Sequence, residues 1–170
     1  LSKILIEKQL TVKCRNINKA KKKFSSDSPL ITNNFSDLYD SDFIFLAIPS
    51  QSVRQNLIDL KKYLKKSKSV FIICSKGVEK KTNKLMSEVV NDIFPKNQKA
   101  ILSGPNFSSE LIANKPSASV ISSTNKKVLN LVSGLLSQKK IRIYFNNDVI
   151  GTQLGGAMKN VIAIACGLIK

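Results

Sequence analysis

A lysine inside an apolar, glycine-rich stretch is the clearest candidate for chemistry in this sequence. Lys159 lies within GTQLGGAMKNVIAIACG, where nearly every other residue is small or apolar. A surface helix would carry more charge, so we expect this helix to be mostly buried and its glycines to allow close packing. A buried lysine needs a partner or a function, and desolvation lowers its pKa. Because the chain contains no His, Lys159 is the natural acid/base candidate; the competing interpretation is a lysine that snorkels at the edge of a helix interface.

Two further candidates lie just after apolar runs that have the length of strands. Lys76 comes after SVFIIC and before Gly77, and the turn SGPN at 103–106 follows the next run. In open α/β sheets, ligands bind at the carboxyl ends of the strands. A lysine there can hold a phosphate or polarise a carbonyl, and the free N–H groups of a helix N-terminus bind anions. The alternatives are an ordinary surface lysine and an ordinary turn between a strand and a helix.

Arg15 follows the apolar segment LTVKC. In dinucleotide-binding folds, an acidic residue after the second strand suits the ribose hydroxyl of NAD, whereas an arginine suits the 2′-phosphate of NADP. The glycine-rich fingerprint of such folds is not among these residues and would lie before Leu1. Arg15 by itself therefore leaves the presence of a dinucleotide site open.

Composition excludes several classes of site. Without His there is no His metal ligand or His base, and Cys14, Cys74 and Cys166 are far apart and form no CxxC pair. We therefore expect no metal, no disulfide framework and a reducing, cytoplasmic compartment. The formal net charge of +17 favours an anionic partner. The lysines are spread along the chain, whereas a nucleic-acid module needs clustered Arg and exposed aromatic residues; we expect no nucleic acid, and salt-sensitive binding of random DNA is the test of that alternative.

Apolar runs alternate with helical stripes along the chain. FIFLAI at 43–48 and SVFIIC at 69–74 are continuous rather than alternating, which indicates central parallel strands covered on both faces. The alternation predicts right-handed βαβ units and an α/β fold with a mostly parallel sheet. Further strands are expected at 10–14, 30–32, 100–102, 118–121 and 141–145, and helices at 51–64, 82–94, 107–113, 126–136 and from 148 to the end.

The two ends of the chain carry their own expectations. Residues 150–169 have about the length of one membrane span. Lys159 and Asn160 interrupt this segment in its middle, which is costly in lipid, so we expect no membrane span. The chain starts with Leu1 in what reads as a helix, and it stops at Lys170 within another helix, so we expect that both ends are cut.

Four stretches carry a resemblance to a known family: FIFLAIPSQ, SKGVEKKTNKLMSEV, LSGPNFSSELIANKPSASV and RIYFNNDVIGTQLGGAMKNVIAIACG. In this order and spacing they resemble the bacterial NAD(P)-dependent glycerol-3-phosphate dehydrogenases. The resemblance implies a Rossmann-like, doubly wound dinucleotide-binding domain at 1–147, truncated at its N-terminus. Residues 148–170 would then be the first helix of an all-helical substrate domain.

The resemblance also implies an activity. The family moves a hydride between NAD(P)H and dihydroxyacetone phosphate, giving sn-glycerol 3-phosphate for glycerophospholipid synthesis. NAD and NADP both remain open as the cofactor, and a homodimer remains open as the assembly. The glycine-rich loop and most of the helical domain are absent from these residues, which implies that the 170 residues alone are inactive.

The resemblance assigns roles residue by residue. Lys159 of GAMKN matches the proton-transferring lysine of the family, and Asn160 matches a substrate-site position. Lys76 matches a lysine that touches both cofactor and substrate, and Arg15 matches a basic position on the adenosine side of the cofactor.

The turn that begins with SGP is implied to supply three further contacts. Gly104 and Asn106 match substrate-binding positions, and Ser108 matches a cofactor-binding position. Bacterial members usually carry Ser or Thr at Asn106 and Ala at Ser108. Asn106 keeps a polar side chain, and a backbone contact at Ser108 is compatible with either residue.

Overall fold

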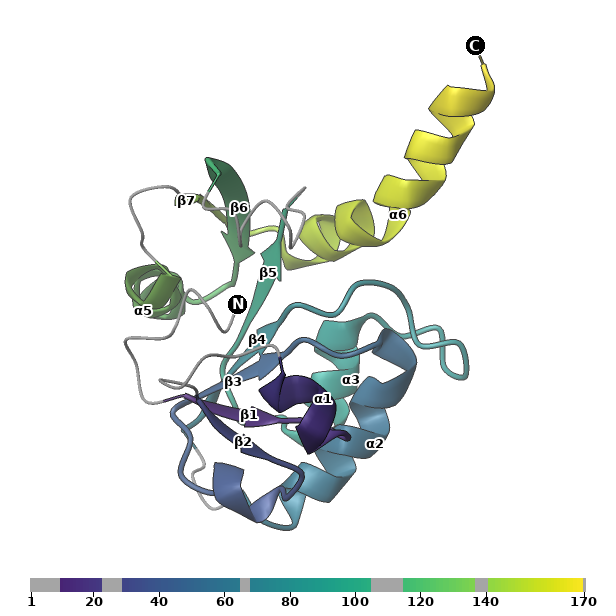
Figure 1. Cartoon of the computed structure of the whole chain (residues 1–170). Helices are drawn as coiled ribbons and strands as arrows, with labels where there is room; N and C mark the ends of the chain where they lie inside the picture. Colours follow the sequence, from purple (N-terminus) through teal and green to yellow (C-terminus); the bar gives the residue numbers. More distant parts are fainter. Residues whose placement is uncertain (1–9, 23–28, 65–67, 105–114, 137–140, 170) are drawn as a thin grey trace.

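The main sheet of the computed structural model has five strands in the order β3-β4-β5-β6-β7 (Figure 1). The structure describes residues 10–22, 29–64, 68–104, 115–136 and 141–169. β3 to β5 run parallel, β6 is antiparallel to β5, and β7 is parallel to β6. The expected α/β fold with a mostly parallel sheet is therefore confirmed. The strand bounds are Phe43–Leu46, Val70–Ile73, Lys99–Ser103, Ser117–Ser122 and Ile141–Asn146.

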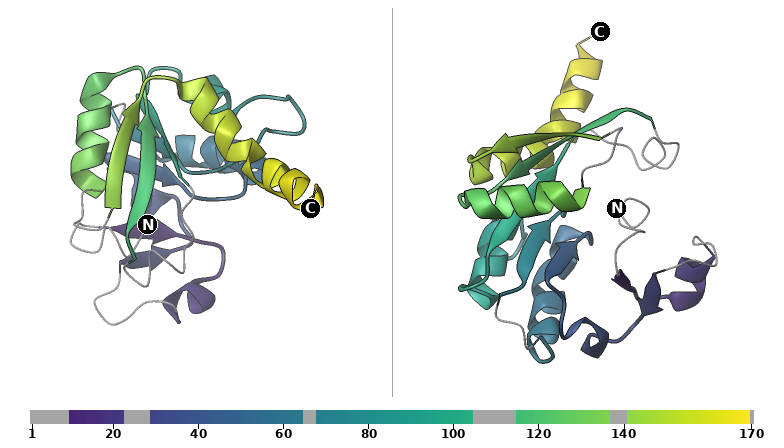
Figure 2. Two further views of the ribbon diagram at one scale, coloured as in Figure 1. Left: turned by 90° about the horizontal axis from the view of Figure 1, so that it is seen from above. Right: turned by 90° about the vertical axis from the view of Figure 1, so that its left-hand side faces the viewer.

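β1 (Thr11–Lys13) and β2 (Leu30–Thr32) form a separate two-stranded parallel sheet. The helix α1 (Ile17–Lys21) connects towards β2, and Figure 2 shows this small unit set apart from the main sheet. The sequence predicted one sheet. The sheet is divided because no strand among the described residues pairs with both β1 and β3.

The core lies on both faces of the main sheet. All four residues of β4 are buried. Phe71 and Ile73 belong to the cluster that includes α2 (Ser50–Lys61) and α3 (Met86–Ile93), whereas Val70 and Ile72 belong to the cluster that includes α5 (Lys126–Leu136). Successive side chains of a strand point to opposite faces, so an unbroken apolar run is what a strand with two covered faces requires. The interpretation of this run as a central strand is confirmed. The same interpretation of FIFLAI at 43–48 is wrong, because β3 lies at the end of the strand order and its buried residues alternate with half-buried ones.

The loop after β4 is longer than the sequence suggested. A helix was expected from Thr82, but α3 begins at Met86. Thr82 instead donates its hydroxyl hydrogen to the Glu79 carboxylate, and Val78 pairs with Leu85 in an isolated antiparallel bridge. These contacts within the loop make residues 75–85 a folded loop rather than the first turn of a helix.

The last helix, α6 (Val149–Leu168), leaves the body of the protein and extends away from it (Figure 1). The expectation that this helix is mostly buried is wrong: Gln153 is its one buried residue among those described, and Ile164 and Leu168 are 65% and 81% exposed. The described part of the chain provides no surface against which its C-terminal half packs.

Among the described residues, α6 is the one helix that is long and apolar enough to cross a membrane by length and composition. Core helices of soluble proteins meet the same criterion, so length and composition alone give no argument for insertion. Lys159 and Asn160 lie in its middle, where they are costly in lipid. The absence of a membrane span stays a prediction.

Candidate functional site

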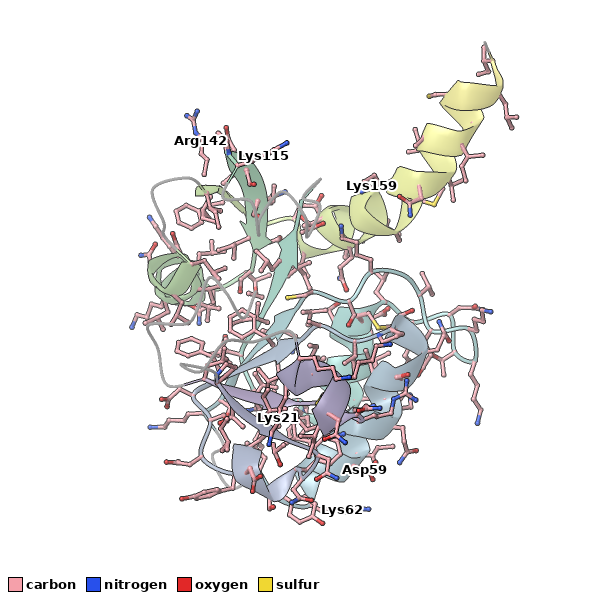
Figure 3. The ribbon with its side chains drawn as sticks, in the orientation of Figure 1. Lys21, Asp59, Lys62, Lys115, Arg142 and Lys159 are labelled. Carbon is pink, nitrogen blue, oxygen red and sulfur yellow. The ribbon has the colours of Figure 1, made fainter. Side chains whose placement is uncertain are left out.

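The candidate site is a cleft between the loop after β4 and the middle of α6. It has a volume of about 270 Å³ and is lined by Lys76, Gly77, Gly156, Ala157, Lys159 and Asn160. The sequence indicates Lys76 by its place after a strand and Lys159 by its apolar surroundings, and the fold places both on one cleft. Figure 3 labels Lys159 on the part of α6 that adjoins the body of the protein. Two cations beside a small cleft at the ends of parallel strands suit an anionic ligand.

Lys76 reaches from the loop after β4 towards the end of β5. Its Nζ donates a hydrogen bond of 3.1 Å to the carbonyl oxygen of Gly104, so the Lys76 and Gly104 predictions come together in space. Burial lowers the pKa of Lys76, and the positive charge of Lys159 lowers it further. Both causes disfavour the charged form, whereas the negative charge of a bound anion would favour it.

Gly156 explains how α6 approaches the strand ends. A Cβ on Gly156 would lie 2.9 Å from the Ser103 hydroxyl oxygen and 3.8 Å from Lys76 Cγ. Without that atom, the helix backbone packs against β5 and the lysine stem. The close packing expected of the other glycines is not general, since a Cβ on Gly155 would meet no described atom within 4 Å.

Two contacts fix the start of α6 and so the place of the cleft. The side chain of Asp148 accepts a 2.7 Å hydrogen bond from the Gly151 amide and caps the helix. Gln153 is 8% exposed and bridges to α3: its Oε1 accepts from the Ser87 amide at 2.9 Å, and its Nε2 donates to the Ser87 hydroxyl at 2.8 Å. Sequence reasoning missed Gln153, although a lone polar residue in an apolar stretch was the same signal that identified Lys159.

Gln153→Ala should destabilise the protein by about 1–3 kcal/mol, because it removes the acceptor of the Ser87 amide and leaves the α6–α3 contact without its hydrogen bonds. Chemical denaturation measures the change. Ile150→Ala is the matched control, since Ile150 is on the same helix and 61% exposed; a surface change of this kind stays within about 0.5 kcal/mol. Equal destabilisation by both variants would contradict the role assigned to Gln153.

The remaining predicted residues are distributed as follows. Asn160 lines the cleft. Arg15 is exposed in the turn between β1 and α1 and is not among the lining residues. Asn106 and Ser108 lie outside the described residues. In the part of the chain that the structure describes, no group of three or more His, Cys, Asp or Glu side chains could hold a metal ion.

Comparison with known families decides the relationship of this chain. Residues 7–129 match the family described as NAD-dependent glycerol-3-phosphate dehydrogenase N-terminus, and residues 148–170 match the family described as its C-terminus. The chain belongs to the NAD-dependent glycerol-3-phosphate dehydrogenase family. The resemblance carried by its sequence motifs is thereby confirmed.

Individual relatives agree with this assignment. The glycerol-3-phosphate dehydrogenase (NAD(P)+) of Neorickettsia sennetsu is 39% identical over 174 residues, which cover 95% of this chain and 52% of the relative. The corresponding protein of Wolbachia pipientis from Culex pipiens is 41% identical over 85% of this chain and 44% of its own length. The crystal structure of glycerol-3-phosphate dehydrogenase from Coxiella burnetii superposes with a TM-score of 0.77 at 28% identity, covering 85% of this chain and 44% of that one. The chain thus spans about half the length of the curated relatives it matches.

Proposed function

We propose that this chain supplies the dinucleotide-binding domain, residues 1–147, and the first helix of the substrate domain, residues 148–170, of a glycerol-3-phosphate dehydrogenase. The proposed reaction transfers a hydride between NAD(P)H and dihydroxyacetone phosphate to give sn-glycerol 3-phosphate. The observation that carries this proposal is the cleft in which Lys76 and Lys159 lie together. We also propose a cytoplasmic enzyme that supplies glycerophospholipid synthesis, and that the 170 residues without the relatives' remaining half do not turn over.

The chemistry of the site fits a dinucleotide and a phosphorylated ketone. The bound nicotinamide would supply the hydride. Lys76 and Gly104 lie at the carboxyl ends of β4 and β5, where such folds hold their ligands. Cofactor contacts are assigned to Lys76, Arg15 and Ser108.

Lys159 is assigned the proton transfer. As hydride reaches the carbonyl carbon, the carbonyl oxygen becomes an alkoxide and must receive a proton. An ammonium group donates that proton and stabilises the developing negative charge beforehand. The substrate contacts are assigned to Lys76, Gly104, Asn106 and Asn160, besides Lys159 itself.

The direct test is oxidation of NADH and NADPH by an active form of the enzyme that contains these 170 residues. We expect turnover with dihydroxyacetone phosphate and little with unphosphorylated dihydroxyacetone, because the cations of the cleft act on the phosphate. The absorbance of the reduced nicotinamide reports the rate. Equal rates with both ketones would overturn the phosphate assignment.

Arg15→Ala should reduce the preference for NADPH over NADH, since an arginine binds a 2′-phosphate bidentately and its loss costs about 1–3 kcal/mol of selective binding. The ratio of kcat/KM for the two cofactors measures the effect. Lys21→Ala is a charge-matched control on the adjacent helix α1. An unchanged ratio in Arg15→Ala would remove Arg15 from the adenosine site.

A further inference from the structure

The loop that carries Lys76 is fastened at its start to the turn between β3 and α2. The Ser75 hydroxyl lies 2.9 Å from the carbonyl oxygen of Leu46 and 2.6 Å from that of Ile48. Gly77 then turns the chain with a φ of 113°, a conformation that L side chains rarely adopt. A Cβ on Gly77 would lie 3.2 Å from the Ser50 hydroxyl oxygen, so the loop passes close to the first residue of α2.

Gln51 hydrogen-bonds with the next part of the loop at two backbone positions. Its Nε2 donates a 2.8 Å hydrogen bond to the Val78 carbonyl oxygen, and its Oε1 accepts a 3.0 Å hydrogen bond from the Lys80 amide. One side-chain amide thus satisfies backbone groups on both sides of Glu79. This geometry fixes the loop relative to the first turn of α2.

Arg54, one turn further along α2, binds the residue between those two contacts. Its Nε and Nη2 lie 2.8 Å and 2.9 Å from the two carboxylate oxygens of Glu79, a bidentate pair in which the Glu79 side chain is 8% exposed. Nη2 also lies 2.9 Å from Asp92 Oδ2 on α3, and the Thr82 hydroxyl donates to Glu79. The hydrogen bonds from Arg54 and Thr82 lower the pKa of Glu79, so its carboxylate stays charged.

We propose that Gln51 and the Arg54–Glu79 ion pair are positioning residues for Lys76. They hold the loop against α2 and α3, and the held loop places the Lys76 ammonium across the cleft from α6. None of the three lines the cleft. Their effect on the reaction therefore passes through Lys76, and in that respect the inference rests on the proposed function.

The first experiment measures the pKa of Lys76 and does not require an active enzyme. Trace acetylation with acetic anhydride between roughly pH 7 and pH 11, read by mass spectrometry, gives the titration of individual lysines. The groups facing Lys76 are Lys159 from α6 and Cys74 from the end of β4; burial raises the pKa of the Cys74 thiol to about 12, so it stays neutral over most of this range. Lys76 of the unmodified protein should titrate at a lower pH than an ordinary lysine, because partial desolvation and the charge of Lys159 both disfavour its charged form.

Gln51→Ala should raise the pKa of Lys76, because the released loop moves the partly desolvated ammonium away from Lys159 and further into water. Glu79→Gln should shift it in the same direction. Gln55→Ala is the matched control: Gln55 is exposed on the same helix, and its side chain hydrogen-bonds with Asp59 of that helix rather than with the loop. An unchanged Lys76 titration in a folded Gln51→Ala protein would overturn the proposal.

The second experiment distinguishes a failure of the positioning role from a failure of the proposed function. In an active form of the enzyme, Gln51→Ala should lower kcat/KM for dihydroxyacetone phosphate about 10-fold, since a misplacement of about 1 Å costs up to roughly 10²-fold. Gln51→Glu keeps the oxygen that accepts from the Lys80 amide but loses the N–H that donates to the Val78 carbonyl oxygen. Its kcat/KM should therefore lie between those of the unmodified enzyme and Gln51→Ala. A kcat/KM equal to that of Gln51→Ala would assign the whole effect to the hydrogen bond with Val78. Absence of turnover in the unmodified enzyme would contradict the proposed function, and the Lys76 titration would still test whether Gln51 positions Lys76. If Glu79→Gln does not fold, Gln51→Ala decides, because it leaves the ion pair intact.

Discussion

Replacing Lys159 by Met in an active form of the enzyme should lower kcat by roughly 10²–10⁴-fold, the usual contribution of a general acid or base. The reduction of a ketone leaves negative charge on the carbonyl oxygen, and Lys159 lines the cleft in which that oxygen would lie. Methionine keeps most of the aliphatic stem and removes both the proton and the charge. The free energy of unfolding should therefore change little.

Steady-state kinetics and chemical denaturation of the same preparations test this prediction. Ile162→Ala is the control on the same helix, because Ile162 does not line the cleft; its kcat should stay close to that of the unmodified enzyme. Lys159→Arg keeps a positive charge but replaces the ammonium by a group that hardly releases its proton, so kcat should remain low. A folded Lys159→Met enzyme that retains more than about a tenth of the original kcat would remove Lys159 from proton transfer.

Sequence patterns predicted the features of the fold that depend on residues close together in the chain. The apolar run of β4 reads as a strand with two covered faces because every one of its side chains enters a core, and that is what the structure has. Lys76 and Lys159 were found separately, one by its place after a strand and the other by its apolar surroundings. Only the topology, which packs α6 against β5 and beside the loop after β4, places them on one cleft.

The contacts that were missed join residues far apart in the chain. Arg54 and Glu79 are polar residues on a helix and a loop, and nothing in their spacing indicates a bidentate pair. In the sequence, Gln51 is an ordinary residue in the first turn of a helix, and only the structure shows that it hydrogen-bonds with the loop. The burial of α6 was wrongly predicted for a related reason: apolar composition says that a helix needs a partner, but not whether the described chain supplies one.

Replacing Lys76 by Met should act on binding more than on proton transfer. Lys76 lines the cleft and donates to the Gly104 carbonyl oxygen, so its loss removes a cation from the place where the proposed function puts the phosphate and the cofactor. The KM values for dihydroxyacetone phosphate and for NAD(P)H should both rise, and kcat/KM should fall by roughly 10–10²-fold, as for the loss of a charge-assisted hydrogen bond. Lys80→Met, which removes an exposed lysine of the same loop, should leave both KM values unchanged.

The pH dependence of KM separates the two lysines. The pKa of Lys76 is lowered in the folded protein by burial and by Lys159. Its charge is present below that pKa and is lost as pH rises through it, so affinity for the phosphate should weaken at a lower pH than for an ordinary lysine. Lys76→Met should abolish this step in KM, whereas Lys159→Met should keep the step and shift it to higher pH, because the charge that disfavours protonated Lys76 is gone. A KM profile that is the same in the unmodified enzyme and in Lys76→Met would show that Lys76 does not hold the anion, and an unshifted step in Lys159→Met would show that the two ammonium groups do not interact across the cleft.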